Sequence, residues 1–156
     1  MSIRGKNVLV GVCGSIAAYK SAFIIRLLIK EGAEVRVVMT ANAQDFITPL
    51  TLATLSKNEC NTAFTNATKT DWNNHVELDL WADVFLIATL SAGNLAKLAN
   101  GICDNLLVAT YLSARCPVYF APSMDEDMWK HGSTVANIEK LISYGNKIIS
   151  VNEGEL

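Results

Sequence analysis

One stretch near the start of the chain, Asn7–Lys20 (NVLVGVCGSIAAYK), constrains the fold most. It begins as an apolar run of the kind found in a buried strand, turns at Gly14 and Ser15, and continues with a helical pattern from Ile16. In such a strand–turn–helix unit, the first backbone N–H groups of the helix lack intrahelical partners, and the helix dipole adds partial positive charge there. The stretch therefore predicts a phosphate-binding site at the turn.

The residues after this stretch predict strands that alternate with helices. A helical pattern over 16–31 ends at Gly32, and a strand pattern rich in β-branched residues follows over 34–39, which indicates a βαβ unit. Later strand patterns lie at 84–88, 117–121 and 147–151, separated by helical patterns, two of which we expect Asp104 and Thr134 to cap. We expect one domain over residues 1–156, a three-layer α/β sandwich with a mostly parallel sheet.

Thr40 occupies the position that best separates the possible phosphate ligands. Folds that bind dinucleotides usually place Asp or Glu at the end of the second strand, about 20 residues past a glycine-rich turn. Here the second strand ends at Thr40, and Gly11 and Gly14 do not match the three-glycine spacing. The sequence therefore disfavours NAD and favours a mononucleotide phosphate. The alternative is that Thr40 only caps a short helix over 41–46.

A second turn of small residues is predicted at the same edge of the sheet. The strand pattern over 84–88 is fully apolar, and Thr89-Leu90-Ser91-Ala92-Gly93-Asn94 follows it before a helical pattern begins at Leu95. Ligands of open α/β sheets bind along the edge where the carboxyl ends of the strands meet. We therefore expect this turn and the turn at Gly14 to line one crevice.

Two segments carry side chains that could take part in chemistry. The polar segment over 60–74, interpreted as a short strand and a long surface loop, ends at His75. An imidazole exchanges protons readily near neutral pH, although a histidine beside a polar loop is more often only solvated. In Pro122–Trp129, three acids accompany two methionines and a tryptophan. That segment is either a short helix anchored in the core, with a solvated acidic face, or a pocket wall that places Asp125 near a ligand.

The composition excludes several classes of protein. Hydrophobic residues make up 51% of the chain and charged residues 18%, the net charge is −2, and no basic cluster with interleaved aromatics indicates a nucleic-acid partner. No apolar run reaches the roughly 18 residues of a membrane-spanning helix, and no pattern of metal ligands occurs. The four cysteines form no C-x-x-C pair, which indicates reduced thiols and a cytoplasmic protein.

Six motifs together resemble one known family. They are Gly14–Lys20, Val38–Thr40, Phe46–Leu50, His75–Leu78, Ala96–Gly101 with Asp104–Leu107, and Pro122–Trp129. With them the chain resembles the homo-oligomeric flavin-containing cysteine decarboxylase family over essentially its whole length. The similarity is greatest to the branch that decarboxylates 4′-phosphopantothenoylcysteine in coenzyme A biosynthesis, which in bacteria is often the N-terminal half of a bifunctional protein.

The resemblance implies a flavodoxin-like, Rossmann-like fold, FMN as the cofactor, and trimers or dodecamers with the FMN site at a subunit interface. It implies that the FMN phosphate is held by Gly14, Ser15 and Ile16 with Thr40 beside them, and that the flavin lies along Ser91, Ala92, Gly93 and Asn94. It further implies that His75, from a neighbouring subunit, is the catalytic acid or base. Met124 and Asp125 match the motif that recognises the carboxylate end of the substrate.

The chain departs from the family pattern at three places. Gly93 and Asp125 each stand where the family has Asn, and a carboxylate at Asp125 would repel a substrate carboxylate. The family's substrate clamp, with its reducing cysteine, would follow Leu156, so we expect a fragment of a longer protein or a form that does not complete the reduction. The alternative functions are a flavin prenyltransferase, a peptidyl-cysteine decarboxylase, and a flavin-binding regulatory subunit without catalysis.

Overall fold

The computed structural model describes residues 2–66 and 68–149. Its strands form one sheet in the order β3-β2-β1-β4-β5-β6, and every pair of neighbouring strands is parallel. The strands are Asn7–Val12 (β1), Glu34–Met39 (β2), Cys60–Asn61 (β3), Val84–Leu90 (β4), Val118–Pro122 (β5) and Lys147–Ile148 (β6). The predicted parallel sheet is confirmed. Of the strand expected over 147–151, the residues after 149 lie outside the described residues.

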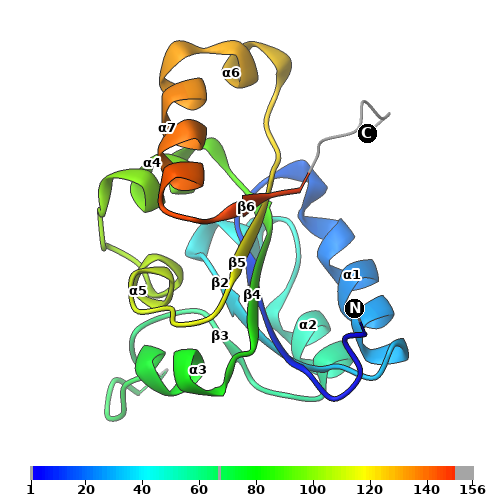
Figure 1. The fold of residues 1–156 in the computed structure, drawn as a ribbon. Helices are drawn as coiled ribbons and strands as arrows, with labels where there is room; N and C mark the ends of the chain where they lie inside the picture. Colours follow the sequence, from blue (N-terminus) through cyan, green and yellow to red (C-terminus); the bar gives the residue numbers. More distant parts are fainter. Residues whose placement is uncertain (1, 67, 150–156) are drawn as a thin grey trace.

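Helices cover both faces of this sheet (Figure 1). One face carries α1 (Lys20–Lys30) and α2 (Pro49–Ser56), and the other carries α3 (His75–Trp81), α4 (Ala92–Asn100), α5 (Leu106–Leu112) and α7 (Gly132–Ser143). The short helix α6 (Glu126–Lys130) lies above the carboxyl ends of the strands, and 3₁₀ helices η1 (Ile16–Tyr19) and η2 (Ala41–Asp45) follow β1 and β2. The fold is thus the predicted three-layer, flavodoxin-like α/β sandwich, with the strand order of a Rossmann sheet.

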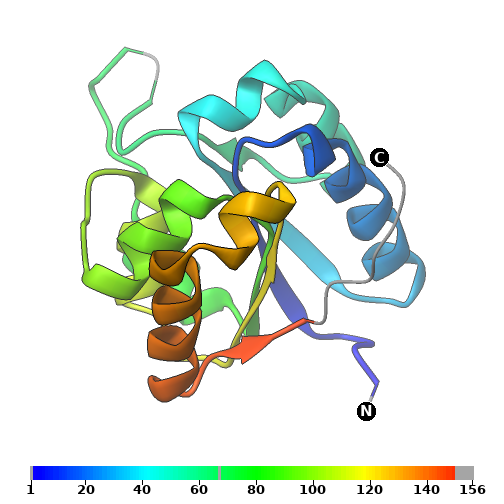
Figure 2. The same ribbon diagram turned by 90° about the horizontal axis from the view of Figure 1, so that it is seen from above.

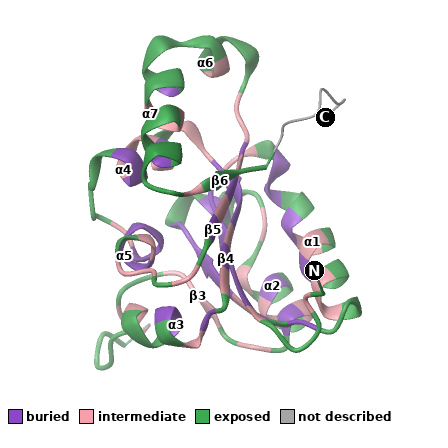
Figure 3. Ribbon diagram, in the orientation of Figure 1, coloured by how far each residue is buried: buried purple, intermediate pink, exposed green. Residues whose placement is uncertain are grey.

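The core has two halves because side chains alternate between the faces of each strand. In β1, Val8, Val10 and Val12 pack in the cluster that contains Ile25 of α1 and Leu52 of α2. Leu9 points the other way, into the cluster formed by α3, α4, α5 and α7. Figure 3 shows the buried residues concentrated along the strands and on the inner sides of the helices. The strands therefore form a rigid frame whose carboxyl ends can position a site.

Two helix caps differ from those we predicted. Asn105, not Asp104, caps α5, since its Oδ1 accepts a hydrogen bond from the Val108 N–H at 2.9 Å. Asp104 instead pairs with Lys97, whose Nζ lies 2.9 Å from its carboxylate. In α7 the prediction of Thr134 is also wrong, because it is buried inside the helix. The cap is His131, whose Nδ1 accepts from the Ser133 N–H at 3.1 Å.

Candidate functional site

The direction of the chain reverses between β1 and β4. From β1 the chain proceeds outward to β2 and β3, and from β4 it proceeds the other way to β5 and β6. Loops that leave the two central strands therefore diverge and open a crevice at the carboxyl edge, which is where ligands of doubly wound sheets bind. Seen from above in Figure 2, the chain after β1 and the start of α4 lie on opposite sides of this edge, with α6 between them.

Three loops are tied together at the carboxyl end of β4. The hydroxyl groups of Ser15 and Thr89 lie 3.3 Å apart, and the Cys13 N–H donates to the Thr89 carbonyl at 3.0 Å. On the other side, the Ser123 N–H donates to the Leu90 carbonyl at 2.9 Å. The β1–η1 turn, the end of β4 and the β5–α6 loop therefore form one connected surface.

The β1–η1 turn brings the backbone close to its neighbours at Gly14. A Cβ at this position would lie 2.9 Å from the Cβ of Asn42, so only glycine fits without displacement. No side chain caps η1, because the Ser15 hydroxyl is directed to Thr89 instead. The start of η1 is thus open to an anionic group, and Ile16 beside it is 64% exposed.

Thr40 carries a buried hydroxyl that has no partner among the described residues. Its side chain is 5% exposed, and its Oγ1 makes no hydrogen bond. Thr40 does precede η2, but its side chain caps nothing there. Its backbone N–H donates to the Val12 carbonyl at 3.0 Å, which fixes Thr40 beside the β1–η1 turn. An unsatisfied buried hydroxyl costs about 1–3 kcal/mol, and a phosphate oxygen at this turn could accept a hydrogen bond from it.

The turn after β4 is shorter than we predicted. Strand β4 extends to Leu90, and Ser91 caps α4, which begins at Ala92. The Ser91 Oγ accepts from the Asn94 backbone N–H at 3.3 Å and lies 3.1 Å from the Asn94 amide nitrogen. The Asn94 Oδ1 in turn accepts from Asn105 at 2.9 Å, so this side chain is directed to α5. A Cβ on Gly93 would meet nothing within 4 Å, so the first turn of α4 leaves open space there.

The β5–α6 loop combines an anchored methionine with an exposed acid. Met124 is half-buried and packs against the core cluster of α4, α5 and α7. Asp125 is the N-cap of α6, and its Oδ1 accepts from the Met128 N–H at 2.9 Å. No residue within α6 is buried. Asp125 therefore lies at the edge of the sheet, on a helix that is attached to the core through its preceding loop.

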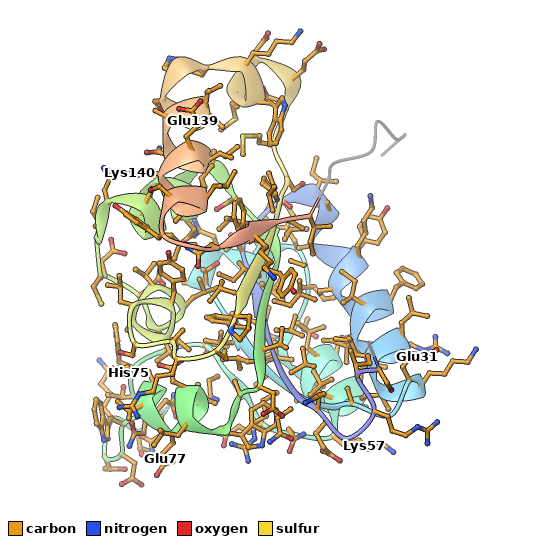
Figure 4. All side chains as sticks on the ribbon, viewed as in Figure 1. Glu31, Lys57, His75, Glu77, Glu139 and Lys140 are labelled. Atoms are coloured by element: carbon orange, nitrogen blue, oxygen red, sulfur yellow. The ribbon has the colours of Figure 1, made fainter. Side chains whose placement is uncertain are left out.

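His75 is remote from these residues within one chain. It is the first residue of α3, and Figure 4 places it beside α3 and α5, far from η1 and α6. Its ring meets Trp72 edge to face, with centroids 5.8 Å apart, and its Nδ1 is buried without a partner among the described residues. The structure therefore brings together all the predicted site residues except His75.

Two open hollows of the described residues lie away from this edge. A hollow of about 670 Å³ lies among the C-terminal ends of α4, α5 and α7, and one of about 480 Å³ lies beside β3 and α3. We use the word shelf for the surface at the carboxyl edge that is formed by the β1–η1 turn, the end of β4 with the first turn of α4, and the β5–α6 loop. Within residues 2–66 and 68–149, no group of three His, Cys, Asp or Glu residues could hold a metal ion, and no helix is long and apolar enough to cross a membrane.

Sequence reasoning missed two residues of the shelf. Thr89 connects the first turn to β4, and Asn105 supports Asn94 from the cap of α5. A cap signal, Asn before an apolar run, could have identified Asn105. The role of Thr89 depends on a hydrogen bond between residues 74 positions apart, which no local pattern reveals.

Comparisons with known proteins identify relatives among flavoproteins and decarboxylases. The family described as Flavoprotein matches residues 1–156. A cysteine/cysteine sulfinic acid decarboxylase from an unknown prokaryotic organism is 54% identical over 110 residues, which are 70% of this chain and 31% of that protein. The coenzyme A biosynthesis bifunctional protein CoaBC of Borreliella burgdorferi is 39% identical over 155 residues, 98% of this chain and 39% of that protein. The chain thus spans well under half the length of these relatives.

Solved structures resemble the chain over nearly its whole length. The FMN-dependent cysteine decarboxylase SpaF superposes with a TM-score of 0.85 at 32% identity, covering 96% of this chain and 85% of that one. A PPC decarboxylase variant in complex with pantothenoylaminoethenethiol superposes with a TM-score of 0.79 at 33% identity, covering 94% and 82%.

Proposed function

Because the chain belongs to the Flavoprotein family, we propose that it binds FMN at the carboxyl edge of its sheet and decarboxylates the cysteine end of 4′-phosphopantothenoylcysteine. The product is 4′-phosphopantetheine, a precursor of coenzyme A. The relatives named for coenzyme A biosynthesis and for FMN-dependent decarboxylation support both parts of the proposal. The observation that carries it is the buried, unpartnered Thr40 hydroxyl beside a turn that only glycine fits.

The phosphate of FMN fits the β1–η1 turn. Gly14 lets the backbone approach the phosphate closely, and Ser15 and Ile16 offer N–H groups at the start of η1. The Thr40 hydroxyl, at the end of β2, can donate a further hydrogen bond to the phosphate. The cap of α4, with Ser91, Ala92, Gly93 and Asn94, is the surface along which the flavin ring would lie. Bound there, FMN would supply an electron sink: removing two electrons from the thiol-bearing carbon would allow the carboxylate on the neighbouring carbon to leave as carbon dioxide.

The protein's own groups position the substrate and move protons. Met124 is fixed by packing, and it places Asp125 at the shelf beside the flavin surface. The imidazole of His75 is proposed as the acid or base that exchanges a proton with the substrate. In one chain His75 lies far from the shelf, so it would act in the site of a neighbouring subunit.

A second copy of the chain is the proposed cover of the open shelf. Ile16, Tyr19, Phe23 and Leu27 form an apolar stripe along η1 and α1, each between 42% and 64% exposed, and the Tyr19 and Phe23 rings stack edge to face at 6.3 Å. Such a contiguous exposed stripe is typical of an interface. We propose that the chain forms a homotrimer or dodecamer. The free thiols of Cys13, Cys60, Cys103 and Cys116 support a cytoplasmic location.

A second candidate function differs only in substrate. The relative that is 54% identical is named for cysteine and cysteine sulfinic acid, which are free amino acids. The flavin site and the role of His75 are the same in both functions.

The proposal is tested by the absorption spectrum and by carbon dioxide release. Purified protein should show flavin bands or take up added FMN, and the loaded protein should release carbon dioxide from 4′-phosphopantothenoylcysteine. A protein that binds no FMN would refute the cofactor assignment, and a flavin-loaded protein without decarboxylation would indicate a non-catalytic flavin-binding subunit.

The role of His75 across subunits has its own test. His75→Asn and Gly14→Ala should each be inactive, the first without its proton carrier and the second without flavin. Mixed oligomers made by co-expression should regain part of the activity, because an intact His75 can then face an intact flavin site. Mixed oligomers as inactive as the parents would contradict the cross-subunit assignment.

A further inference from the structure

We propose that the Asp125 carboxylate binds a free α-ammonium group, so that this site also decarboxylates free cysteine. The inference rests on the proposed function, because it concerns the substrate of the same flavin site. It names a substrate class, an unacylated amino acid with a thiol side chain, and it names the residue that selects this class.

Asp125 is held close to the end of β4. The Ser123 N–H is bonded to the Leu90 carbonyl, and Asp125 follows two residues later, so its Cα lies within about 7 Å of the Ser123 Cα. The neighbouring residue, Thr89, is hydrogen-bonded through its hydroxyl to Ser15 of the β1–η1 turn. Asp125 and the proposed phosphate site therefore flank the same strand end, and Figure 2 shows α6 above this end, between α4 and η1.

The cap of α6 fixes the direction of the carboxylate. The Oδ1 atom of Asp125 accepts from the Met128 N–H at 2.9 Å, while nothing in the described part of the chain bonds to its Oδ2. The side chain is exposed at the shelf. One oxygen thus orients the group, and the other is free to accept a hydrogen bond from a bound molecule.

The charges around Asp125 favour a cationic group on the part of a substrate that lies beside it. Glu126 and Asp127 follow it directly, and the nearby Lys130 is already paired with Glu126 at 2.6 Å. A phosphorylated, acylated cysteine carries negative charges, and at this carbon it offers only a neutral amide N–H, which bonds a carboxylate more weakly than an ammonium group does. Free cysteine carries an ammonium group on the same carbon as the carboxylate that leaves, and an ammonium donates a charge-assisted hydrogen bond to Asp125.

A named relative supplies an independent indication. The substrates in the name of the cysteine/cysteine sulfinic acid decarboxylase both have a free α-ammonium group. The reaction balances without a further reagent: the bond from Cα to the carboxylate breaks, carbon dioxide leaves, and a Cα–H bond forms with one proton from the medium. The two electrons taken from the thiol-bearing carbon return to it, so cysteine gives cysteamine with no net oxidation.

The test compares substrates with and without the ammonium group. Flavin-loaded protein is supplied with L-cysteine, N-acetyl-L-cysteine or 4′-phosphopantothenoylcysteine, and carbon dioxide release gives kcat/KM for each. We expect Asp125→Asn to lower the ratio of kcat/KM for L-cysteine to that for N-acetyl-L-cysteine about tenfold, the effect of one charged hydrogen bond. Asparagine also caps helices well, so α6 should remain folded.

Asp127→Asn is the matched control, since it removes the same charge two residues further on. It should leave the ratio within about twofold of the parent value. The inference is overturned if Asp125→Asn leaves the ratio unchanged, if Asp127→Asn changes it as much, or if the protein acts on 4′-phosphopantothenoylcysteine but not on cysteine. Release of carbon dioxide from none of the three substrates would instead refute the proposed function itself.

Discussion

Asp79 is a buried carboxyl group whose titration should dominate the pH dependence of stability. It lies on α3 with 4% of its surface exposed, and neither carboxylate oxygen has a hydrogen-bond partner among the described residues. Burial raises the pKa of Asp79 from 3.8 to about 7, although the positive charge of Arg115 partly offsets this. The folded protein therefore holds a proton on Asp79 at pH values where the unfolded chain has released it.

The sign of the effect follows from proton binding. Between pH 4 and 7 the folded state binds one more proton than the unfolded state, so the free energy of unfolding falls by about 1.4 kcal/mol for each pH unit. The full shift corresponds to as much as about 4 kcal/mol, lost as the pH rises to about 7 and constant above it. Asp79→Asn removes this titration, so the variant should exceed the parent in stability at pH 8 by about 2–4 kcal/mol.

Urea unfolding between pH 4 and 8, at a fixed FMN concentration, measures this difference. Asp45→Asn is the control, because Asp45 is exposed on η2 and its replacement should change stability by less than about 0.5 kcal/mol. Arg115→Gln should extend the decline above pH 7, since Arg115 lowers the pKa of Asp79. Parallel profiles for the parent and Asp79→Asn would refute the reasoning.

Three further predictions follow from the site and the core. Thr40→Val should weaken FMN binding about tenfold in a fluorescence titration, whereas Thr40→Ser, which keeps the hydroxyl, should not. Gly14→Ala brings a Cβ to 2.9 Å from neighbouring atoms and should lower the free energy of unfolding by about 1–3 kcal/mol, while Gly132→Ala, which meets nothing within 4 Å, should not. A thiol reagent should label exposed Cys103 at once and Cys13 only on unfolding, because Cys13 is fully buried and burial raises its pKa to about 11; equal labelling rates would contradict the structure.

Most of the fold could be predicted because its strands are buried on both faces. Such strands appear in the sequence as largely apolar runs, and β1, β4 and β5 lie where those runs do, while β2 lies where a segment rich in β-branched residues predicted it. The caps were less predictable, since several polar residues often stand before a helix. We predicted Asp104 as the cap of α5, but Lys97 engages Asp104 from another helix and the next residue, Asn105, is the cap.

The parts of the site that depend on local sequence were also predictable. The turn at Gly14 and the position of Thr40 follow from the βαβ pattern, and both lie at the expected edge. The unpartnered state of the Thr40 hydroxyl could not be read from the sequence, because an N-cap threonine normally bonds to its own helix. It is this difference from an ordinary cap that distinguishes a ligand-binding hydroxyl from a structural one.

His75 lies away from the shelf within one subunit. Its helix precedes β4, so α3 is attached to the amino end of the sheet while the shelf forms at the carboxyl end. In the folded subunit, Figure 4 places His75 far from η1 and α6. If His75 acts on the substrate, the active site must therefore be shared between subunits. The exposed apolar stripe of η1 and α1 would then be buried in the interface between them. Assembly would be a condition of catalysis in this protein.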